Sequence, residues 1–351
     1  MRLRTVGLSV ASVALLAVSM TPAYADPDAT DSGSIAAQEP AQVTVPLRMM
    51  DGPRLAGQSG VAEIRLGGSA PIPVVVDTGF TGLILFPNAW TRKPGGVSVA
   101  TSRVSAAMPG GKSVKGFPGT APMTINGVTT VYPIQFLYTS SDSPFFDAWR
   151  KVGVRGLMGV GTKGSNIMVN PLSALPGELG LRWSLHLVRD VMSTGGRNGS
   201  LVLGAQPPTA PSLVYQLPYV GENVNGAAMW NDHAANGCWK FGATREECVP
   251  TTFDSAFTTM RIVGRQFGRV PQDTRGMVRP GTRIGLAAEG SAFTGWSITA
   301  GGRASADLAE VISSGKSAVN TGNAPFFNFT VTYNAATGRV YLSDPIGKAG
   351  R

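Results

Sequence analysis

Two eight-residue segments in opposite halves of the chain repeat one residue pattern. Residues 76–83 read VDTGFTGL, and residues 253–260 read FDSAFTTM. Each segment has an apolar residue, an aspartate, Thr or Ser, a small residue, Phe, Thr, a variable residue and a large apolar residue. The two aspartates, Asp77 and Asp254, lie 177 positions apart in a chain of 351 residues. This repeat predicts two related lobes that each contribute one aspartate.

The surroundings of each aspartate matter, because Asp-Thr-Gly and Asp-Ser-Gly are also ordinary turn sequences. Residues 31–33 read Asp-Ser-Gly, but they lie in a polar tail with no strand before them, so we give them no catalytic role. Asp77 follows the apolar residues 73–76 and precedes residues 83–86, which predicts a loop between two buried strands. The setting of Asp254 is parallel but less apolar.

Short β-rich segments punctuated by Gly, Pro and Asn predict an all-β architecture. The chain has 45 Gly and 25 Pro and is only 15% charged, which suits many turns. Residues 329–342 predict a hairpin that turns near 334–338, and residues 172–191 contain the best helical stretch. The other expected strands are residues 60–66, 72–76, 83–86, 123–125, 131–138 and 199–204.

The N-terminus predicts export. Arg2 and Arg4 precede an apolar run at residues 6–18 and a small-x-small site ending at Ala25. We expect a signal peptide cleaved after Ala25 and a secreted or cell-envelope protein. A membrane anchor is disfavoured because the run is short, and no later segment is long and apolar enough to span a bilayer. The expected organisation is a signal peptide at 1–25, a disordered tail or short pro-segment at 26–42, an N-terminal lobe at 43–195 and a C-terminal lobe at 196–351.

The two cysteines and the net charge add weaker constraints. In an exported protein Cys238 and Cys248 predict one disulfide, with a pair of free thiols as the alternative. The formal net charge is +9, but the basic residues are scattered and do not alternate with aromatic residues, which argues against nucleic-acid binding. Attraction to an anionic envelope and an ordinary solvated surface both remain open.

A pair of carboxylates about 3 Å apart can hydrolyse a peptide bond without a metal, because the two cannot both ionise comfortably. One keeps a proton and polarises the scissile carbonyl, while the other draws a proton from water. The pair titrates as a unit, so the sequence assigns neither role to a particular aspartate. The small residues Gly79 and Ala256 let backbone N–H groups approach the carboxylates. The hydroxyls of Thr78 and Ser255 can form hydrogen bonds between the lobes.

These motifs resemble those of pepsin-like aspartic proteases. More closely, they resemble the aspartic protease domains at the C-termini of some mycobacterial PE-PGRS proteins, which process PE-domain substrates at the cell envelope. The resemblance covers roughly residues 43–345 and rests on VVVDTGFTGLILFP, GLMGVG, NGSLVLG, TTFDSAFT and GNAPFFNFTVTYNAATGRVYL.

This resemblance implies a bilobal fold with a central cleft between two related β-lobes. It implies that Asp77 and Asp254 are the catalytic pair and that Thr78 and Ser255 join the lobes. It also implies a polypeptide substrate bound as an extended strand in the cleft, with no cofactor and no metal. We expect a monomer.

The family also carries a β-hairpin flap over the cleft. Residues 104–114, VSAAMPGGKSV, match it, with Pro109, Gly110 and Gly111 at the tip and Met108 beside it. Glycines at the tip permit the closing motion that orders the substrate. An ordinary surface hairpin is the alternative interpretation, and the aspartate pair is what favours a flap.

The chain departs from the family pattern at three places. The flap lacks the tyrosine common in pepsins, and Met108 or a neighbour takes its place. Phe80 and Phe257 replace the Ser or Thr that often supports each carboxylate. Ala256 replaces the second glycine and adds a Cβ where the backbone approaches closely. Because the Phe replacement occurs in both segments, we interpret it as a subfamily trait that tunes the pair or lowers its activity.

Other hydrolase mechanisms find little support. The chain has two histidines, His186 and His233, without the His-x-x-x-His spacing of a zinc peptidase, and it has no Gly-x-Ser-x-Gly elbow. Bridged cysteines would exclude a cysteine nucleophile. The remaining alternative is a catalytically weak or inactive pepsin fold that serves as a binding or inhibitor protein. Such folds typically lose an aspartate or its small neighbour; because this chain keeps both aspartates and loses one glycine, we favour an aspartic endopeptidase.

Overall fold

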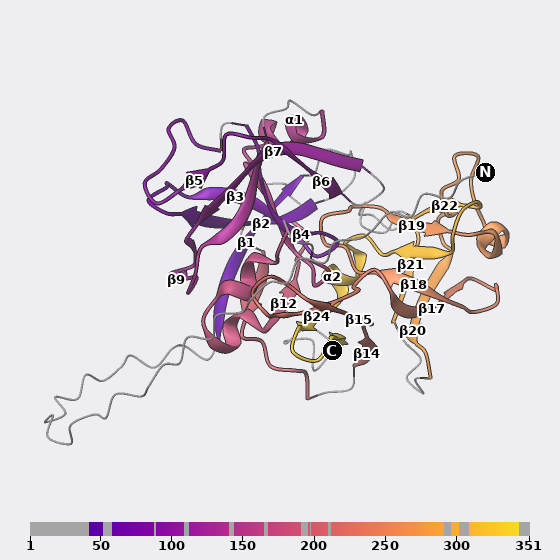
Figure 1. The fold of residues 1–351 in the computed structure, drawn as a ribbon. Coiled ribbons are helices and arrows are strands. Elements are labelled where there is room, and N and C mark those ends of the chain that lie inside the picture. The colour runs from indigo at the N-terminus through magenta and orange to yellow at the C-terminus, as the bar shows by residue number, and fades with distance from the viewer. Residues whose placement is uncertain are drawn as a thin grey trace, which may run out of the picture. The chain divides into compact units, whose positions relative to one another are not determined.

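The computed structural model builds the chain mainly from short strands (Figure 1). It describes residues 42–51, 58–87, 89–108, 112–139, 144–164, 168–190, 196, 198–209, 212–290, 296–301 and 309–343. These residues contain the helices α1 (Pro144–Lys151) and α2 (Ala324–Asn328) and the 3₁₀ turns η2 (Pro171–Ala174), η3 (Gly177–Gly180) and η4 (Arg265–Arg269). The expected all-β class is confirmed. Within these ranges no helix has the length and apolar character needed to cross a bilayer.

The first half of the chain, residues 43–195, contributes the strands coloured from indigo to magenta (Figure 1). Strand β11 lies between β3 and β4, parallel to β3 and antiparallel to β4. Strands buried on both faces read as continuous apolar runs, and β4 and β11 are buried along their whole length. The strands are β1 (Val43–Asp51), β2 (Gln58–Leu66), β3 (Ile72–Asp77), β4 (Thr81–Leu85), β5 (Ser98–Val99), β6 (Val104–Met108), β7 (Lys112–Ala121), β8 (Met123–Ile125), β9 (Val128–Thr129), β10 (Ile134–Thr139), β11 (Gly156–Val160) and β12 (Arg182–His186).

The second half repeats the central arrangement of the first. Strand β23 lies between β18 and β19, parallel to β18 and antiparallel to β19. These strands belong to a seven-stranded sheet of order β21-β20-β17-β18-β23-β19-β22. The strands of this half are β13 (Gly199–Leu203), β14 (Leu213–Gln216), β15 (Tyr219–Glu222), β16 (Ala228–Trp230), β17 (Ala235–Phe241), β18 (Glu247–Thr252), β19 (Met260–Val263), β20 (Arg283–Ala288), β21 (Trp296–Thr299), β22 (Ala309–Ile312), β23 (Ala318–Asn320), β24 (Thr330–Asn334) and β25 (Arg339–Ser343).

A shared run of strands joins the two halves. In the order β14-β25-β24-β12-β13-β1, strands β1 and β12 come from the first half and the other four from the second. The lobe boundary expected at residues 195 and 196 falls between β12 and β13, which are hydrogen-bonded neighbours. The two halves therefore meet within one sheet, and the boundary itself stays a prediction.

The helix expected within residues 172–191 is wrong. This stretch forms the turns η2 and η3 and then the strand β12. The interruption has a local cause, because Pro176 and the glycines of η3 do not favour a continuous helix. His186 ends β12, where its ring nitrogen Nδ1 lies 3.0 Å from the carbonyl of Phe329. Strands β2, β3, β4, β8 and β13 and the hairpin of β24 and β25 agree with expectation, whereas β10 starts three residues later than expected, at Ile134.

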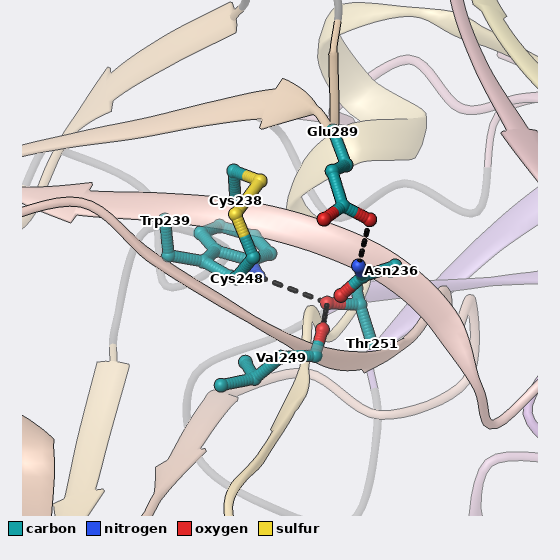
Figure 2. Close-up of a disulfide and its surroundings, with 7 residues drawn as sticks. All are labelled: Asn236, Cys238, Trp239, Cys248, Val249, Thr251 and Glu289. Atoms are coloured by element: carbon teal, nitrogen blue, oxygen red, sulfur yellow. Dashed lines mark hydrogen bonds between the residues drawn. A yellow bond between two sulfur atoms is a disulfide. The ribbon is translucent and has the colours of Figure 1, made fainter.

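The expected disulfide is present and joins adjacent strands of the second half (Figure 2). Cys238 on β17 pairs directly with Cys248 on β18, and their Cα atoms are 3.9 Å apart. Beside the disulfide, Trp239 Nε1 donates a hydrogen bond of 2.9 Å to Thr251 Oγ1. The crosslink therefore fixes the register of the strand pair that leads to Asp254.

Candidate active site

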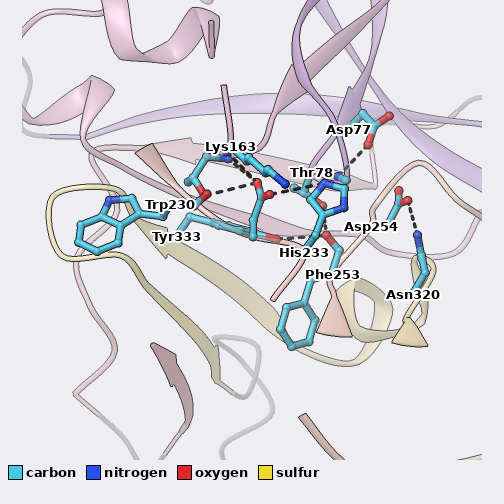
Figure 3. A network of polar contacts seen from close by, with 12 residues as sticks. Asp77, Thr78, Lys163, Trp230, His233, Phe253, Asp254, Asn320 and Tyr333 are labelled. Atoms are coloured by element: carbon cyan, nitrogen blue, oxygen red, sulfur yellow. Dashed lines mark hydrogen bonds and ion pairs between the residues drawn. The ribbon is translucent and has the colours of Figure 1, made fainter. Parts of the chain in front are cut away.

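The two aspartates occupy equivalent positions in the two halves. Asp77 is the last residue of β3, and Asp254 follows the end of β18 by two positions. Each then enters a short loop that leads to the next strand, β4 or β19. The carboxyl groups of Asp77 and Asp254 lie within hydrogen-bonding reach of each other. The structure therefore brings together the two residues that the repeat singled out (Figure 3).

Four crossed hydrogen bonds tie the two loops together. Thr78 Oγ1 donates to the carbonyl of Phe253 at 2.8 Å and accepts from the Ser255 N–H at 3.0 Å. Ser255 Oγ donates to the carbonyl of Val76 at 2.8 Å and accepts from the Thr78 N–H at 3.1 Å. Both side chains are buried, so each hydroxyl satisfies backbone groups that water does not reach. The geometry thus matches the role expected for Thr78 and Ser255.

Gly79 and Ala256 follow the hydroxyl residues in the two loops and differ in their contacts. The Gly79 N–H donates to Asp77 Oδ1 at 2.9 Å, and the Ala256 N–H donates to Asp254 Oδ1 at 3.2 Å. A Cβ at position 79 would lie 2.4 Å from Asp254 Cγ, closer than a real contact allows. The methyl group of Ala256 instead packs against a buried apolar cluster of the first half that includes Phe80. Only the first loop therefore requires glycine for the approach of the other aspartate.

The two phenylalanines of the repeat lie in different surroundings. Phe80 is buried in the apolar cluster of the first half. Phe257 is partly buried, and the guanidinium of Arg261 lies 5.4 Å from its ring centroid. The Phe257 N–H donates to Asp254 Oδ1 at 3.0 Å. Because neither phenylalanine carries a hydroxyl, side-chain support for the carboxylates has to come from elsewhere.

One such support comes from Asn320, a residue that the repeated aspartate motifs do not include. Its Nδ2 donates to Asp254 Oδ2 at 2.8 Å, and its Oδ1 accepts from the Gly322 N–H at 2.8 Å (Figure 3). Asn320 ends β23, within the segment that echoes GLMGVG of the first half. One sequence signal could have revealed this role: Asn320 is polar, whereas the corresponding position in GLMGVG of the first half is apolar.

Burial controls the electrostatics of the pair. Burial is the main cause that raises the pKa of Asp77 well above its ordinary value, the charge of Asp254 adds to it, and the Gly79 N–H opposes it. Burial also raises the pKa of Asp254, but the hydrogen bonds from Asn320, Phe257 and Ala256 lower it. Hydrogen bonds to a carboxylate favour its charged form. The two halves thus give their aspartates unequal environments.

A third carboxyl group, Asp232, lies in a buried network near the pair. Its Oδ2 accepts from the backbone N–H groups of Thr162 and Lys163, and its Oδ1 lies 3.6 Å from His233 Nε2. Burial raises the pKa of Asp232, while the charge of His233 lowers it. The Tyr333 hydroxyl donates to the carbonyl of Phe253 at 3.2 Å, the same carbonyl that accepts from Thr78 Oγ1 (Figure 3).

The expected flap is a hairpin of β6 and β7. Val104 pairs with Gly116, and Met108 pairs with Lys112 at the end of the hairpin. Met108 is partly buried and packs against the same apolar cluster as Ala256. The expected tip residues Pro109, Gly110 and Gly111 lie outside the described residues, so the flap role stays a prediction.

Metal-ligating side chains gather at one place in the described ranges, Cys238, Glu246 and Cys248. Both cysteines form the disulfide and therefore do not provide thiolates as metal ligands.

Comparison with known proteins supports the same interpretation. The aspartic proteinase from Irpex lacteus matches with a TM-score of 0.61 and 18% identity, over 88% of this chain and 99% of that chain. This match confirms the bilobal pepsin-like fold. No curated protein sequence matches the chain. The model of the PE-PGRS C-terminal aspartyl peptidase-like domain matches residues 43–339. Since that match includes both aspartates and most of the chain, the protein belongs to the PE-PGRS C-terminal aspartyl peptidase-like family.

Proposed function

We propose that this protein is an aspartic endopeptidase that hydrolyses peptide bonds through a water activated by Asp77 and Asp254. The observation that carries the proposal is the contact between two carboxyl groups from the two halves, that of Asp254 buried and that of Asp77 partly buried, held together by the crossed hydrogen bonds of Thr78 and Ser255. The raised pKa values favour retention of one proton by the pair. The protonated carboxyl polarises the scissile carbonyl, and the ionised one accepts a proton from the attacking water.

The substrate we propose is a polypeptide bound in extended form. The hairpin of β6 and β7 would cover it, with Met108 on the apolar cluster next to the second aspartate loop. The basic start and apolar run before Ala25 support a secreted or cell-envelope enzyme, whose substrates would be envelope or secreted proteins. We further propose that residues 26–42 form a tail or short pro-segment.

A second candidate function is a catalytically weak or inactive pepsin fold that binds a partner. Ala256 favours it, because this residue takes the place of the family's second glycine. The phenylalanines Phe80 and Phe257 favour it too, because they provide no hydroxyl to either carboxylate. The retained aspartates and crossed hydrogen bonds make the endopeptidase the better-supported proposal.

The test is cleavage of a peptide library by the chain without residues 1–25 and by the chain without residues 1–42. We expect cleavage in mild acid, and we expect Asp77→Asn and Asp254→Asn each to reduce it by roughly 100- to 10,000-fold. The matched control is Asp190→Asn, a buried aspartate of the first half that accepts from the Gly196 N–H. Folded protein that cleaves no library member from about pH 3 to about pH 7 would favour the binding protein.

A further inference from the structure

The two aspartates are not equally supplied with hydrogen-bond donors. Among the described residues, Asp254 accepts from three donors, the N–H groups of Ala256 and Phe257 and the amide of Asn320. Asp77 accepts from the Gly79 N–H and contacts Asp254 itself. Each donor favours the ionised form of the carboxylate that it meets. The negative charge of the pair is therefore better accommodated on Asp254.

The orientation of the Asn320 amide is fixed by a second contact. Its Oδ1 accepts from the Gly322 N–H, so the NH₂ group has to face Asp254. Gly322 has a φ of +58°, and a Cβ there would lie 2.8 Å from the carbonyl of Phe257, so this turn depends on glycine. An NH₂ group donates and does not accept, and its hydrogen bond to an ionised carboxylate is stronger than one to a neutral carboxyl, so Asn320 favours the ionised form of Asp254.

The strand position of the first half that is equivalent to Asn320 holds an apolar residue, Leu157. Asn320 is opposite Thr252 in the parallel pair of β23 and β18, just as Leu157 is opposite Val75 in the pair of β11 and β3. Leu157 is 2% exposed and belongs to the apolar cluster of the first half. The equivalent position thus gives Asp77 an apolar neighbour and Asp254 a hydrogen-bond donor.

We propose that Asn320 is a positioning residue that holds Asp254 in the ionised form and places the shared proton of the pair on Asp77. The inference rests on the proposed peptidase function and deepens it, because it divides the work of the pair. Asn320 does not touch the reacting atoms; it acts through Asp254.

The proton balance of the step follows from this assignment. Asp254 takes one proton from water as the water oxygen bonds to the scissile carbonyl carbon, and Asp77 gives its proton to the carbonyl oxygen. The product is a neutral tetrahedral diol. When the C–N bond breaks, Asp254 gives its proton to the leaving nitrogen and Asp77 takes one back from a hydroxyl of the diol. Both aspartates thereby return to their starting forms.

Other charged groups surround Asp254 and act on its titration. The charge of His233 lowers the pKa of Asp254, while Asp77 shares the site. Arg261 is opposite Asn320 on β19, and its guanidinium is paired with Glu310 on β22. The remaining titratable or charged groups of the network are Asp232, Lys163 and Tyr333. None of these is changed by a substitution at position 320, so a variant there isolates the effect of the amide.

The test measures the carboxyl titrations directly, by ¹³C NMR of protein labelled at the aspartate carboxyl carbons. Asp77→Asn and Asp254→Asn assign the two resonances. In the wild type we expect the titration step at lower pH to belong mainly to Asp254. In Asn320→Leu, which places there the residue of the equivalent first-half position, we expect that step to move upward by roughly one pH unit and to spread to Asp77.

The acid limb of the kcat/KM profile provides a second readout. It should move upward by the same amount in Asn320→Leu, with kcat more affected than KM, and Asn320→Gln should restore part of the shift. The control is Asn328→Leu, which removes an amide that donates to the Ala324 carbonyl within α2 and should move neither titration.

A first titration step at Asp77 in the wild type would overturn the inference, and this outcome does not depend on the folding of any variant at position 320. Unmoved titrations in a folded Asn320→Leu protein would overturn it as well. If the NMR titrations shift as expected but no peptide is cleaved, the proposed function fails and the asymmetry stands. If peptides are cleaved but the titrations do not shift, the peptidase stands and the role of Asn320 fails.

Discussion

The two aspartate loops share a backbone arrangement and differ in what surrounds each carboxylate. Each loop follows the strand that runs parallel to the central strand of its group, β3 beside β11 and β18 beside β23, and each places a hydroxyl residue in the crossed hydrogen bonds. The first loop passes so close to Asp254 that Gly79 has no room for a side chain, whereas the second accommodates Ala256. The second loop also receives the amide of Asn320. A duplicated framework therefore does not impose duplicated electrostatics.

The strongest contrast between the two loops is expected from substitutions at their small residues. Gly79→Ala should reduce peptide cleavage by roughly 100-fold and destabilise the fold by about 1–3 kcal/mol, because the new Cβ would displace Asp254. Ala256→Gly should change cleavage only a few-fold, since it removes a tolerated methyl group. Cleavage rates and urea unfolding of both variants check this. Equal losses of cleavage rate and of unfolding free energy in the two variants would contradict the proposed difference between the loops.

The crossed hydrogen bonds should show a smaller asymmetry. Ser255→Ala leaves the Val76 carbonyl and the Thr78 N–H without their partner, and should cost about 2–3 kcal/mol of unfolding free energy. Thr78→Val should cost less, because the Phe253 carbonyl keeps the hydrogen bond from Tyr333.

Urea unfolding of both single variants and of the double variant measures this difference. We expect the double variant to lose less than the sum of the single losses, because the residues belong to one network. A larger loss for Thr78→Val than for Ser255→Ala would contradict the comparison.

The smallest expected effect is the pH dependence of stability. The folded pKa of Asp77 is raised, so its contribution is fully present below the ordinary value of 3.8 and is lost as the pH rises through the folded pKa. Each pKa unit corresponds to about 1.4 kcal/mol, discounted here because Asp77 keeps partial contact with solvent. We expect the unfolding free energy to fall as the pH rises above about 4.

The two loops can be compared by the same measurement. Asp77→Asn should flatten this pH dependence more than Asp254→Asn, because the donors of Asp254 already offset part of its burial. Thermal unfolding between mild acid and neutrality checks both variants. If Asp254→Asn flattened the pH dependence of the unfolding free energy more than Asp77→Asn, the better-stabilised charge would lie on Asp77 and the comparison would be reversed.

Much of the architecture follows from the local pattern of apolar and polar residues. The helix that this pattern predicted within residues 172–191 is wrong, and it shows where the local pattern is insufficient. Alternating and apolar runs gave β2, β3, β4 and β13 because side chains alternate with period two along a strand. Residues 172–191 are apolar without a clear period, and there Pro and Gly divided the stretch into turns before β12. The disulfide could be expected once the N-terminal segment had predicted export, since two cysteines in an exported chain favour pairing.

The pairing of Asp77 with Asp254 could be inferred from the chain alone, because a repeated motif is visible along the sequence. The same motif also indicated the hydroxyl residues beside them, Thr78 and Ser255. The close approach of Gly79 to Asp254 and the hydrogen bond from Asn320 to Asp254 become visible in the folded chain. Asn320 is 66 positions from Asp254, and its contact depends on the pairing of β23 with β18. The strength of a buried charge depends on such neighbours in space, which no spacing along the chain reveals.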